Sequence, residues 1–218
     1  MIKLLEKAKN IFLNIIFPNI CFACKNNLKQ NEEVLCRECF QSIDLNKNLP
    51  INIGENIKLF HITSYQNKVI KDLIHKLKFK KLKSTIKPIH QITNAYLKNQ
   101  NIKANIIIPI PLSRKRFSER GFNQSELIAQ TISQILNIPL QKNLIKIKHT
   151  TPQSTLTISQ RQSNIKNVFK IKNPENLKNK NIILVDDIYT SGATTSEAIK
   201  TLNQANPKEI TIIVLAKT

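Results

Sequence analysis

Three segments of this chain are nearly unbroken runs of apolar residues, and they alternate with segments of helical spacing. The apolar runs cover residues 105–111, 181–185 and 209–216. Apolar residues recur at helical spacing in 68–79, 84–99, 122–137 and about 193–204, and a polar stretch occupies 141–180. A strand that is apolar along its whole length is buried on both faces of its sheet, which is typical of parallel strands covered by helices. The sequence therefore predicts an α/β fold with a mainly parallel sheet, to which 57–65 adds a further strand.

The length and the N-terminus limit the class of protein. A chain of 218 residues, 41% of them hydrophobic, can build one sizeable core and a small appendage. No apolar run reaches the roughly 18 residues that a membrane-spanning helix needs. Residues 1–20 have the spacing of an amphipathic helix and lack the features of a signal peptide. We expect this helix to pack on the rest of the protein or, alternatively, to attach to a membrane surface, and we expect a cytoplasmic protein.

The charge is strongly unbalanced. The formal net charge is +20, from 34 Lys and Arg against 14 Asp and Glu. Such a surface attracts polyanions, which include nucleic acid, phosphorylated small molecules and anionic lipid. Only five of the basic residues are Arg, and three of these, Arg114, Arg116 and Arg120, fall within seven residues. Arg in place of Lys indicates a planar, bidentate contact to phosphate or carboxylate.

The four cysteines lie close together in two C-x-x-C pairs. Cys21 and Cys24 form the first pair and Cys36 and Cys39 the second, with eleven residues between the pairs. Two disulfides are the alternative, but a cytosolic protein disfavours them, and paired C-x-x-C turns place four thiolates at the corners of a tetrahedron. The spacing predicts a closed, structural zinc site. We therefore divide the chain into an N-terminal helix plus zinc ribbon (1–48) and an α/β domain (49–218).

The apolar run 181–185 is followed by DDIYTSGATT, whose residues suit a phosphorylated sugar. The backbone N–H groups of 190–194 can form a phosphate cup at a helix N-terminus, with hydroxyl side chains around it and Gly192 allowing close approach. Asp186 and Asp187 can accept hydrogen bonds from a vicinal diol and help to hold a divalent cation. Two alternatives are a Walker B element, which no P-loop sequence accompanies, and simple caps of the next helix. In an open α/β sheet this segment and the Arg cluster after 105–111 open on the same edge.

Several motifs of this chain, taken in order, resemble those of a known family. VDDIYTSGAT is similar to the signature by which type I phosphoribosyltransferases bind phosphoribosyl pyrophosphate (PRPP). The order of CFAC, CREC, IIPIPLSRKRFSERGFNQSELIA, TPQSTLTISQRQSN and VDDIYTSGATTSEAIKTLNQA resembles the ComF (competence protein F) family over nearly the whole chain. The resemblance implies a type I phosphoribosyltransferase fold that carries an N-terminal zinc ribbon.

The resemblance also implies a set of site residues. Asp186 and Asp187 would contact the ribose hydroxyls directly or through Mg²⁺, and the loop 112–116 would hold the pyrophosphate. The implied catalytic residues are Asp186, Asp187, Arg114 and Arg116. The implied PRPP-binding residues are Asp186, Asp187, Thr190, Ser191, Gly192, Ala193, Thr194, Leu112, Ser113, Arg114 and Lys115. The implied candidates for a mobile lid are Arg120, Gln153, Arg161 and Asn164.

Three positions depart from the wider pattern. Thr190 stands where purine-salvage relatives carry an acidic general base, so hypoxanthine–guanine salvage is not expected. Ser191 replaces the more usual Thr but keeps the hydroxyl group. Lys146 stands where the family often has Arg.

The sequence leaves three functions open. If the protein is an enzyme, it would displace pyrophosphate from ribose C1 in favour of an acceptor that the sequence does not identify. Alternatively it binds single-stranded DNA, as the role of ComF relatives in natural transformation implies, together with other DNA-uptake or recombination proteins. The basic stretch 75–84 fits such a groove but is also typical of a solvated helix face, and the aromatic residues available for stacking are Phe60, Tyr65, Phe79, Phe117 and Phe122. A third possibility is a domain that only binds a ribose phosphate as a regulatory ligand.

Overall fold

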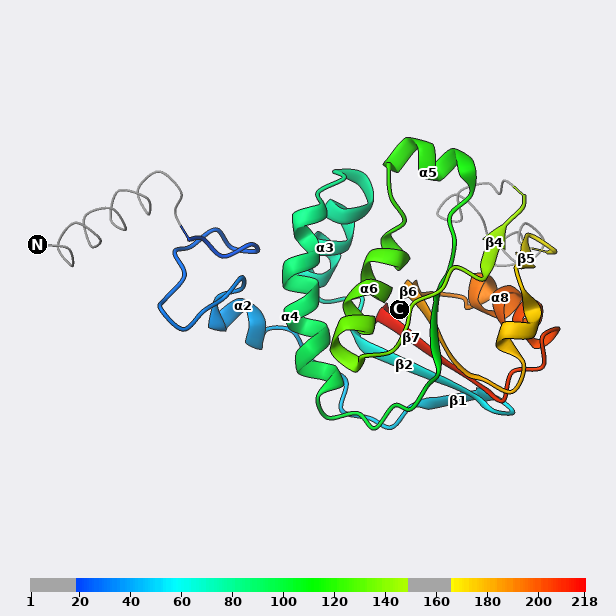
Figure 1. Ribbon diagram of the computed structural model, residues 1–218. Helices are drawn as coiled ribbons and strands as arrows, with labels where there is room; N and C mark the ends of the chain where they lie inside the picture. The colour runs from blue at the N-terminus through cyan, green and yellow to red at the C-terminus, as the bar shows by residue number, and fades with distance from the viewer. Residues whose placement is uncertain (1–18, 149–165) are drawn as a thin grey trace, which may run out of the picture.

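The main sheet has five strands, four of which are parallel. A computed structural model of the protein describes residues 19–148 and 166–218 (Figure 1). The strands lie in the order β1-β2-β7-β6-β3, and β1 pairs with β2 in antiparallel fashion. Their bounds are Ile51–Gly54 (β1), Ile57–Ser64 (β2), Ile106–Pro109 (β3), Asn181–Tyr189 (β6) and Glu209–Lys217 (β7). The prediction of a mainly parallel α/β sheet is confirmed, and β1 is an edge strand that the sequence analysis missed.

Helices cover both faces of this sheet. The predicted helices are present with nearly the expected bounds, as α3 (Lys68–Phe79), α4 (Ile86–Leu97), α6 (Gln124–Leu136) and α8 (Ala193–Asn203). Side chains that alternate along β6 supply the two hydrophobic cores: Ile183 and Val185 pack with α3, α4 and α6, whereas Ile182 and Leu184 pack with α8. Because both faces are buried, the strands need apolar residues along their whole length.

β6 is longer than predicted and contains the two acids. We expected the strand to end at Val185, but it continues through Asp186 and Asp187 to Tyr189. The reason is that β7 pairs with it in parallel to its end, with Tyr189 opposite Lys217. The acids are therefore held by strand pairing and not by a loop.

A short helix, a two-stranded hairpin and a 3₁₀ turn lie where the sequence indicated loops or a polar stretch. The Arg cluster after β3 forms a short helix, α5 (Arg114–Arg120), which the side chain of Ser113 caps by accepting a hydrogen bond from the Arg116 N–H. The polar stretch contains a two-stranded hairpin, β4 (Leu144–Lys146) with β5 (Phe169–Ile171), and a 3₁₀ turn, η3 (Pro174–Leu177). Leu144, Phe169 and Leu177 are buried in the core under α8, so the stretch is polar overall but has apolar anchors.

The N-terminal module lies beside α3 and α4 (Figure 1). It contains the helix α2 (Arg37–Gln41), and its buried residues Cys21, Leu35, Cys36 and Ile43 belong to the same hydrophobic core as α3. The Asn67 side chain donates a hydrogen bond of 2.6 Å to the Ser42 carbonyl, which ties the module to the start of α3. Within 19–148 and 166–218, no helix has the length and apolar character needed to cross a membrane.

Candidate functional site

The two acids of β6 have different partners. The Oδ2 atom of Asp187 lies 2.5 Å from the Lys78 ammonium of α3, and its Oδ1 atom accepts a hydrogen bond from the Ile188 N–H. The Oδ1 atom of Asp186 accepts hydrogen bonds from the Ser125 hydroxyl at 2.8 Å and from the Asp187 N–H at 2.9 Å. In the described part of the chain, no hydrogen bond reaches the Oδ2 atom of Asp186. The Lys78 ammonium and the Ser125 hydroxyl group thus offset the repulsion between the two adjacent carboxylates.

The protonation of Asp186 is sensitive to its surroundings. Burial and, to a lesser degree, the charge of Asp187 raise the pKa of its carboxyl group to about 7, although the Ser125 hydrogen bond and Lys78 act in the opposite direction. A carboxyl group with a pKa near neutrality can lose its proton when a ligand arrives, and the carboxylate can then coordinate a cation or accept a hydrogen bond from a ligand hydroxyl group.

The RGFNQ segment (residues 120–124) joins α5 to α6 and links the two acids of β6 to the end of β3. Gly121 ends α5 in the left-handed conformation (φ 79°), and the Asn123 side chain caps α6 while donating a 2.9 Å hydrogen bond to the Ile110 carbonyl. Arg120 donates to Gln124 at 2.8 Å, and Ser125 reaches Asp186. This segment therefore fixes α5, the end of β3 and the acids relative to one another.

The turn after β6 leads into α8, and Gly192 is its N-cap with φ 73°. A Cβ atom at Gly192 would lie 2.7 Å from Cζ of Tyr189 and closer still to its hydroxyl oxygen, so any other residue would strain the backbone and displace the Tyr189 ring. Thr190 and Ser191 are exposed, and Ala193 and Thr194 begin the helix. The turn thus has the close backbone approach and the helix N-terminus that the predicted phosphate cup requires.

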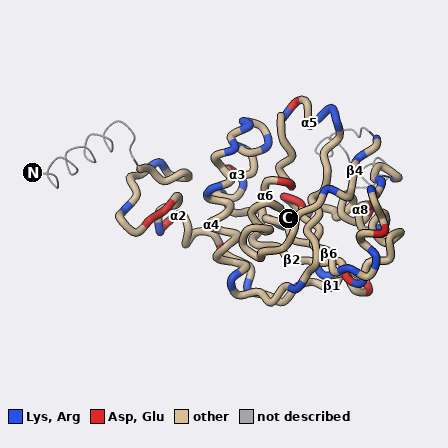
Figure 2. Tube along the Cα trace, in the orientation of Figure 1, with Lys and Arg blue, Asp and Glu red and all other residues tan. Residues whose placement is uncertain are grey.

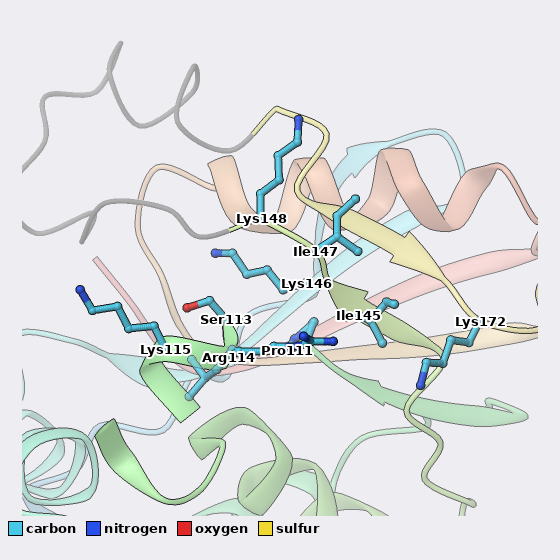
Figure 3. Close-up of a pocket in the computed structure, with 10 residues that line it drawn as sticks. Pro111, Ser113, Arg114, Lys115, Ile145, Lys146, Ile147, Lys148 and Lys172 are labelled. Carbon is cyan, nitrogen blue, oxygen red and sulfur yellow. The ribbon is translucent and has the colours of Figure 1, made fainter. Parts of the chain in front are cut away.

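The start of the Arg cluster borders a cavity of about 670 Å³ (Figure 3). One wall is the turn from Pro111 to Lys115, and the other comes from the β4–β5 hairpin, as the figure shows. The cavity is lined by Pro111, Leu112, Ser113, Arg114, Lys115, Ile145, Lys146, Ile147, Lys148 and Lys172. The backbone places this turn beside the acids, because the Ile110 N–H donates a 2.9 Å hydrogen bond to the Val185 carbonyl. No acidic side chain is among these lining residues, so the cavity favours anions.

Lys146, at the end of β4, lines this cavity from the hairpin side. Burial, and to a lesser degree Arg116, lowers the pKa of its ammonium group to about 8, and Asp186 opposes this shift. Its ammonium is also 5.8 Å from the centre of the Phe169 ring. The effect of both Arg116 and Asp186 on one ammonium group indicates that the Arg cluster and the acids share one electrostatic environment.

The five candidate aromatic residues differ in exposure. Phe60 and Phe122 are buried and have no face free for stacking, and Tyr65 is half-buried. Phe79 is 65% exposed and Phe117 is 50% exposed, and the Arg120 guanidinium lies 5.7 Å from the centre of the Phe79 ring. Lys and Arg gather over the upper ends of α3 and α5 and over β4 (Figure 2).

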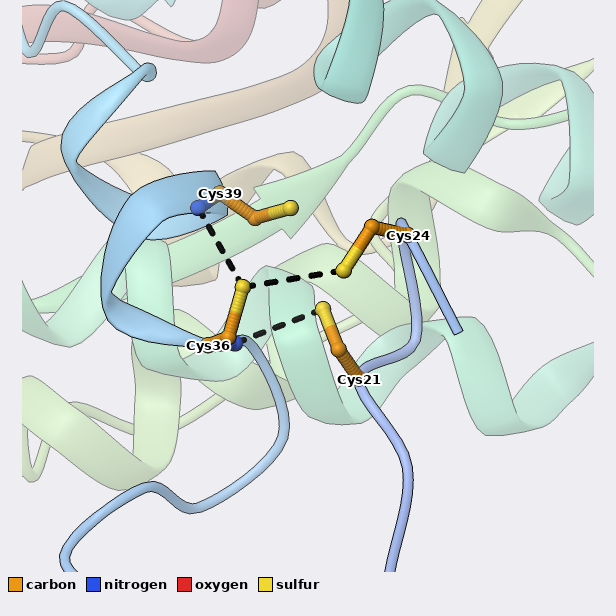
Figure 4. A group of neighbouring side chains, drawn as sticks. All are labelled: Cys21, Cys24, Cys36 and Cys39. Atoms are coloured by element: carbon orange, nitrogen blue, oxygen red, sulfur yellow. Dashed lines mark hydrogen bonds between the residues drawn. The ribbon is translucent and has the colours of Figure 1, made fainter. Parts of the chain in front are cut away.

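The four cysteines converge at one point (Figure 4). Their sulfur atoms all lie within 4.8 Å of one another, and Cys24 and Cys36 are 3.7 Å apart. Four thiolates around a zinc ion with bonds of about 2.3 Å would be about 3.8 Å apart, so the cluster fits such an ion. No disulfide joins these residues. Backbone N–H groups of Cys36 and Cys39 point at the sulfur atoms of Cys21 and Cys36, as is suitable for stabilising thiolates.

Not every predicted residue lies in the described part of the chain. Gln153, Arg161 and Asn164, three of the four lid candidates, fall outside it, as does most of the predicted N-terminal helix. Arg120, the fourth, lies in α5 and is paired with Gln124. The sequence analysis missed Lys78, Lys148 and Lys172, because a lysine-rich sequence does not show which lysines face the site.

Several known proteins are similar to parts of this chain. Residues 123–218 match the phosphoribosyl transferase domain family. Competence protein F of Haemophilus influenzae is 38% identical over 113 residues, which are 51% of this chain and 49% of that protein. DNA utilization protein YhgH of Escherichia coli K12 is 23% identical over 92% of this chain and 98% of that protein, and competence protein ComFC of Bacillus subtilis is 25% identical over 84% and 77%. Among solved structures, an adenine phosphoribosyltransferase of Leishmania tarentolae is 13% identical, with a TM-score of 0.43 over 78% of this chain and 94% of the other. The strongest of these matches thus spans about half the length of the curated relative.

Proposed function

Since the chain belongs to the ComF family of the type I phosphoribosyltransferase superfamily, we propose that it binds PRPP with Mg²⁺ at the carboxyl edge of its sheet and acts in DNA uptake and use. The observation that carries the proposal is the order of groups along β6. Two acids near the end of β6 are followed, after Ile188 and Tyr189, by a turn with Gly192 in the left-handed conformation and by the N-terminus of α8. We place this role in the cytoplasm, with other DNA-uptake or recombination proteins as partners.

Each part of PRPP has a counterpart in this arrangement. The turn from Thr190 to Thr194 would hold the 5-phosphate through its backbone N–H groups. Asp186 and Asp187 would face the ribose hydroxyls. Leu112–Lys115, together with Arg116, would hold the pyrophosphate, since this turn follows directly on the strand beside the acids.

The residues present also fit a divalent cation. Mg²⁺ prefers oxygen ligands and is usually held by one or two carboxylates plus substrate phosphates, and Asp186 offers an oxygen that accepts no hydrogen bond from the described residues. When bound, Mg²⁺ would neutralise charge that develops on the departing pyrophosphate. Arg114 and Arg116 would add to this electrostatic stabilisation from the protein side.

If transfer occurs, pyrophosphate leaves ribose C1 and an acceptor takes its place. Thr190 is not a base, so position 190 supplies no carboxylate to deprotonate a purine ring. This disfavours purine salvage and leaves the acceptor open. A protein that only senses the ligand would bind PRPP without releasing pyrophosphate, so an assay for released pyrophosphate separates the two roles.

Isothermal titration calorimetry with PRPP and Mg²⁺ tests the binding. We expect Mg²⁺-dependent heat of binding that is lost in the double variant Asp186→Asn/Asp187→Asn. Asp44→Asn is the matched control, because it removes one carboxylate at an exposed position in the N-terminal module. Thermal melting of each variant establishes that it is folded. Unchanged affinity for PRPP in the folded double variant would refute the proposal.

We assign the cysteine cluster to a structural zinc ion. Four thiolates close the coordination shell of zinc, which leaves no position for a substrate, so the ion would stabilise the fold and take no part in transfer. Zinc binding would also stabilise the packing of α3, because Cys21 and Cys36 belong to the same hydrophobic core as this helix.

A second candidate function is binding of single-stranded DNA without transfer. It is favoured by the net charge of +20 and by two exposed aromatic rings, Phe79 and Phe117, among basic residues of α3 and α5. This function predicts salt-sensitive retardation of single-stranded oligonucleotides in a native gel. The absence of a shift at low ionic strength would contradict it.

A further inference from the structure

Two cavities meet at Arg114. The cavity of about 670 Å³ lies between the turn that starts α5 and the β4–β5 hairpin. A second cavity, of about 550 Å³, is lined by Leu112, Arg114, Phe117, Ser118 and Gly121. Because Leu112 and Arg114 line both, the cavities adjoin each other. We call them together the rim track, which runs from Lys148 and Lys172 at one end, past Arg114, to Phe117 at the other.

The rim track is larger and more basic than pyrophosphate requires. Pyrophosphate has nine heavy atoms, whereas pockets of about 300–1,000 Å³ enclose drug-sized ligands. The basic residues that line the first cavity are Arg114, Lys115, Lys146, Lys148 and Lys172, and no described residue that lines either cavity is acidic. Lys148 and Lys172 lie on the hairpin wall, opposite the turn that would hold pyrophosphate (Figure 3). These two lysines are therefore available to bind an anion other than the pyrophosphate.

The apolar lining of the rim track indicates the class of that anion. Phe117 is 50% exposed and borders the second cavity, and Ile147 is 54% exposed in the first. Cations that alternate with exposed apolar and aromatic side chains suit a ligand with both phosphates and flat rings. Single-stranded nucleic acid has this character, since its backbone follows a basic groove and its bases stack on aromatic rings.

We propose that the rim track binds single-stranded nucleic acid and that the strand and PRPP exclude each other at Arg114. The exclusion rests on the proposed PRPP site, which assigns Arg114 to the pyrophosphate. A guanidinium group that forms a bidentate contact with one phosphate cannot form the same contact with another. PRPP would thus release the strand, and the strand would weaken binding of PRPP by the same factor, because coupling between two equilibria is reciprocal.

Fluorescence anisotropy of a labelled oligothymidylate tests the track. The variant Lys148→Gln/Lys172→Gln removes two phosphate contacts, so the slope of log K against log salt should become shallower by about 1.4. Phe117→Ala should weaken binding roughly 5- to 150-fold through the loss of one stacked base. The matched control is Lys98→Gln/Lys103→Gln, which removes two exposed lysines near the opposite, amino end of β3. An effect of the track variants no larger than that of this control would overturn the assignment.

The exclusion has its own test. Titration of the protein–oligonucleotide complex with PRPP and Mg²⁺ should lower the affinity for the oligonucleotide at least tenfold, and calorimetry in the presence of the oligonucleotide should give the same factor for PRPP. If both ligands bind and neither changes the other's affinity, the exclusion is wrong while the proposed PRPP function stands. If calorimetry of the free protein detects no PRPP binding, the proposed function and the exclusion both fail, and the track variants still decide the nucleic-acid site.

Discussion

Replacing Lys78 by Met should destabilise the protein more than replacing a lysine of an exposed ion pair. The Lys78 side chain is 19% exposed and the Asp187 side chain 6% exposed, so the substitution leaves a nearly buried carboxylate without its cation. At the observed 2.5 Å separation and an effective dielectric constant of about 20, the attraction is about 7 kcal/mol, most of which the desolvation of the two charges offsets. Removing one partner of a buried pair typically costs about 3–5 kcal/mol.

The lower part of this range is expected here. Arg120 lies close enough to Asp187 for the carboxylate to raise the pKa of the guanidinium, although burial lowers that pKa overall, and it would partly replace the lost cation. A loss of about 3 kcal/mol in a chain of this size corresponds to roughly 6–12 °C in the melting temperature. Urea denaturation and thermal melting, followed by circular dichroism, measure both quantities.

A double-mutant cycle separates this ion pair from loss of packing. Lys78→Met/Asp187→Asn removes both charges and should recover most of the stability that Lys78→Met loses. Lys58→Met is the matched control, since Lys58 and Glu209 form a pair 2.9 Å apart whose side chains are 44% and 32% exposed, and such pairs contribute about 0–1 kcal/mol. If Lys78→Met costs no more than Lys58→Met, or if Asp187→Asn restores nothing, the reasoning from burial is wrong.

Three further predictions concern the turn, the cysteines and pH. Gly192→Ala should lower the melting temperature and weaken PRPP binding more than Gly121→Ala, because a Cβ atom at Gly192 meets the Tyr189 ring, whereas at Gly121 it meets no described atom within 4 Å beyond the adjoining residues. Equal effects in calorimetry and melting would contradict this. Cys36→Ser should lower both the zinc content, measured by atomic emission, and the melting temperature, and a full complement of zinc in the variant would count against a four-thiolate site. The folded pKa of Asp186, about 7, lies above the roughly 3.9 of an unfolded Asp, so the folded state holds the extra proton and stability should fall as pH rises from about 4 to about 7. Asp186→Asn should flatten this part of the urea-denaturation profile, and an unaltered slope would show that another group is responsible.

Local patterns in the sequence predicted the elements that are regular and buried. The helical spacing of α3 and α6 is encoded in neighbouring residues, so their bounds agree with the structure to within about two residues. The four sulfur atoms meet as predicted because C-x-x-C turns set their geometry locally. The edge strand β1 was missed because all four of its residues are exposed and give no pattern of burial.

The arrangement of charges depends on tertiary contacts and was beyond prediction from the sequence. The continuation of β6 through Asp187 depends on pairing with β7, which lies more than twenty residues away along the chain. The pairing of Lys78 with Asp187 joins residues more than one hundred positions apart, and nothing local distinguishes Lys78 from Lys76 or Lys80. The role of Ser125 as a hydrogen-bond donor to Asp186 likewise depends on where α6 begins against the sheet.

The core shared by the cysteine module and α3 limits how the chain can be divided. Cys21, Cys36 and Leu35 are buried together with Leu73 and Leu77 of α3, so a cut near residue 48 would separate the two segments in sequence but expose apolar surface on both. A protein that starts at residue 49 would be expected to associate or aggregate, and its α3 would be freer to shift. Since α3 holds Lys78 against Asp187, loss of a zinc ion bound by the cysteines would alter the packing of α3 and thereby the position of Lys78 beside Asp187. Oxidation of the thiols, or loss of an ion that they bind, would in this way weaken the Lys78–Asp187 pair at the carboxyl edge of the sheet.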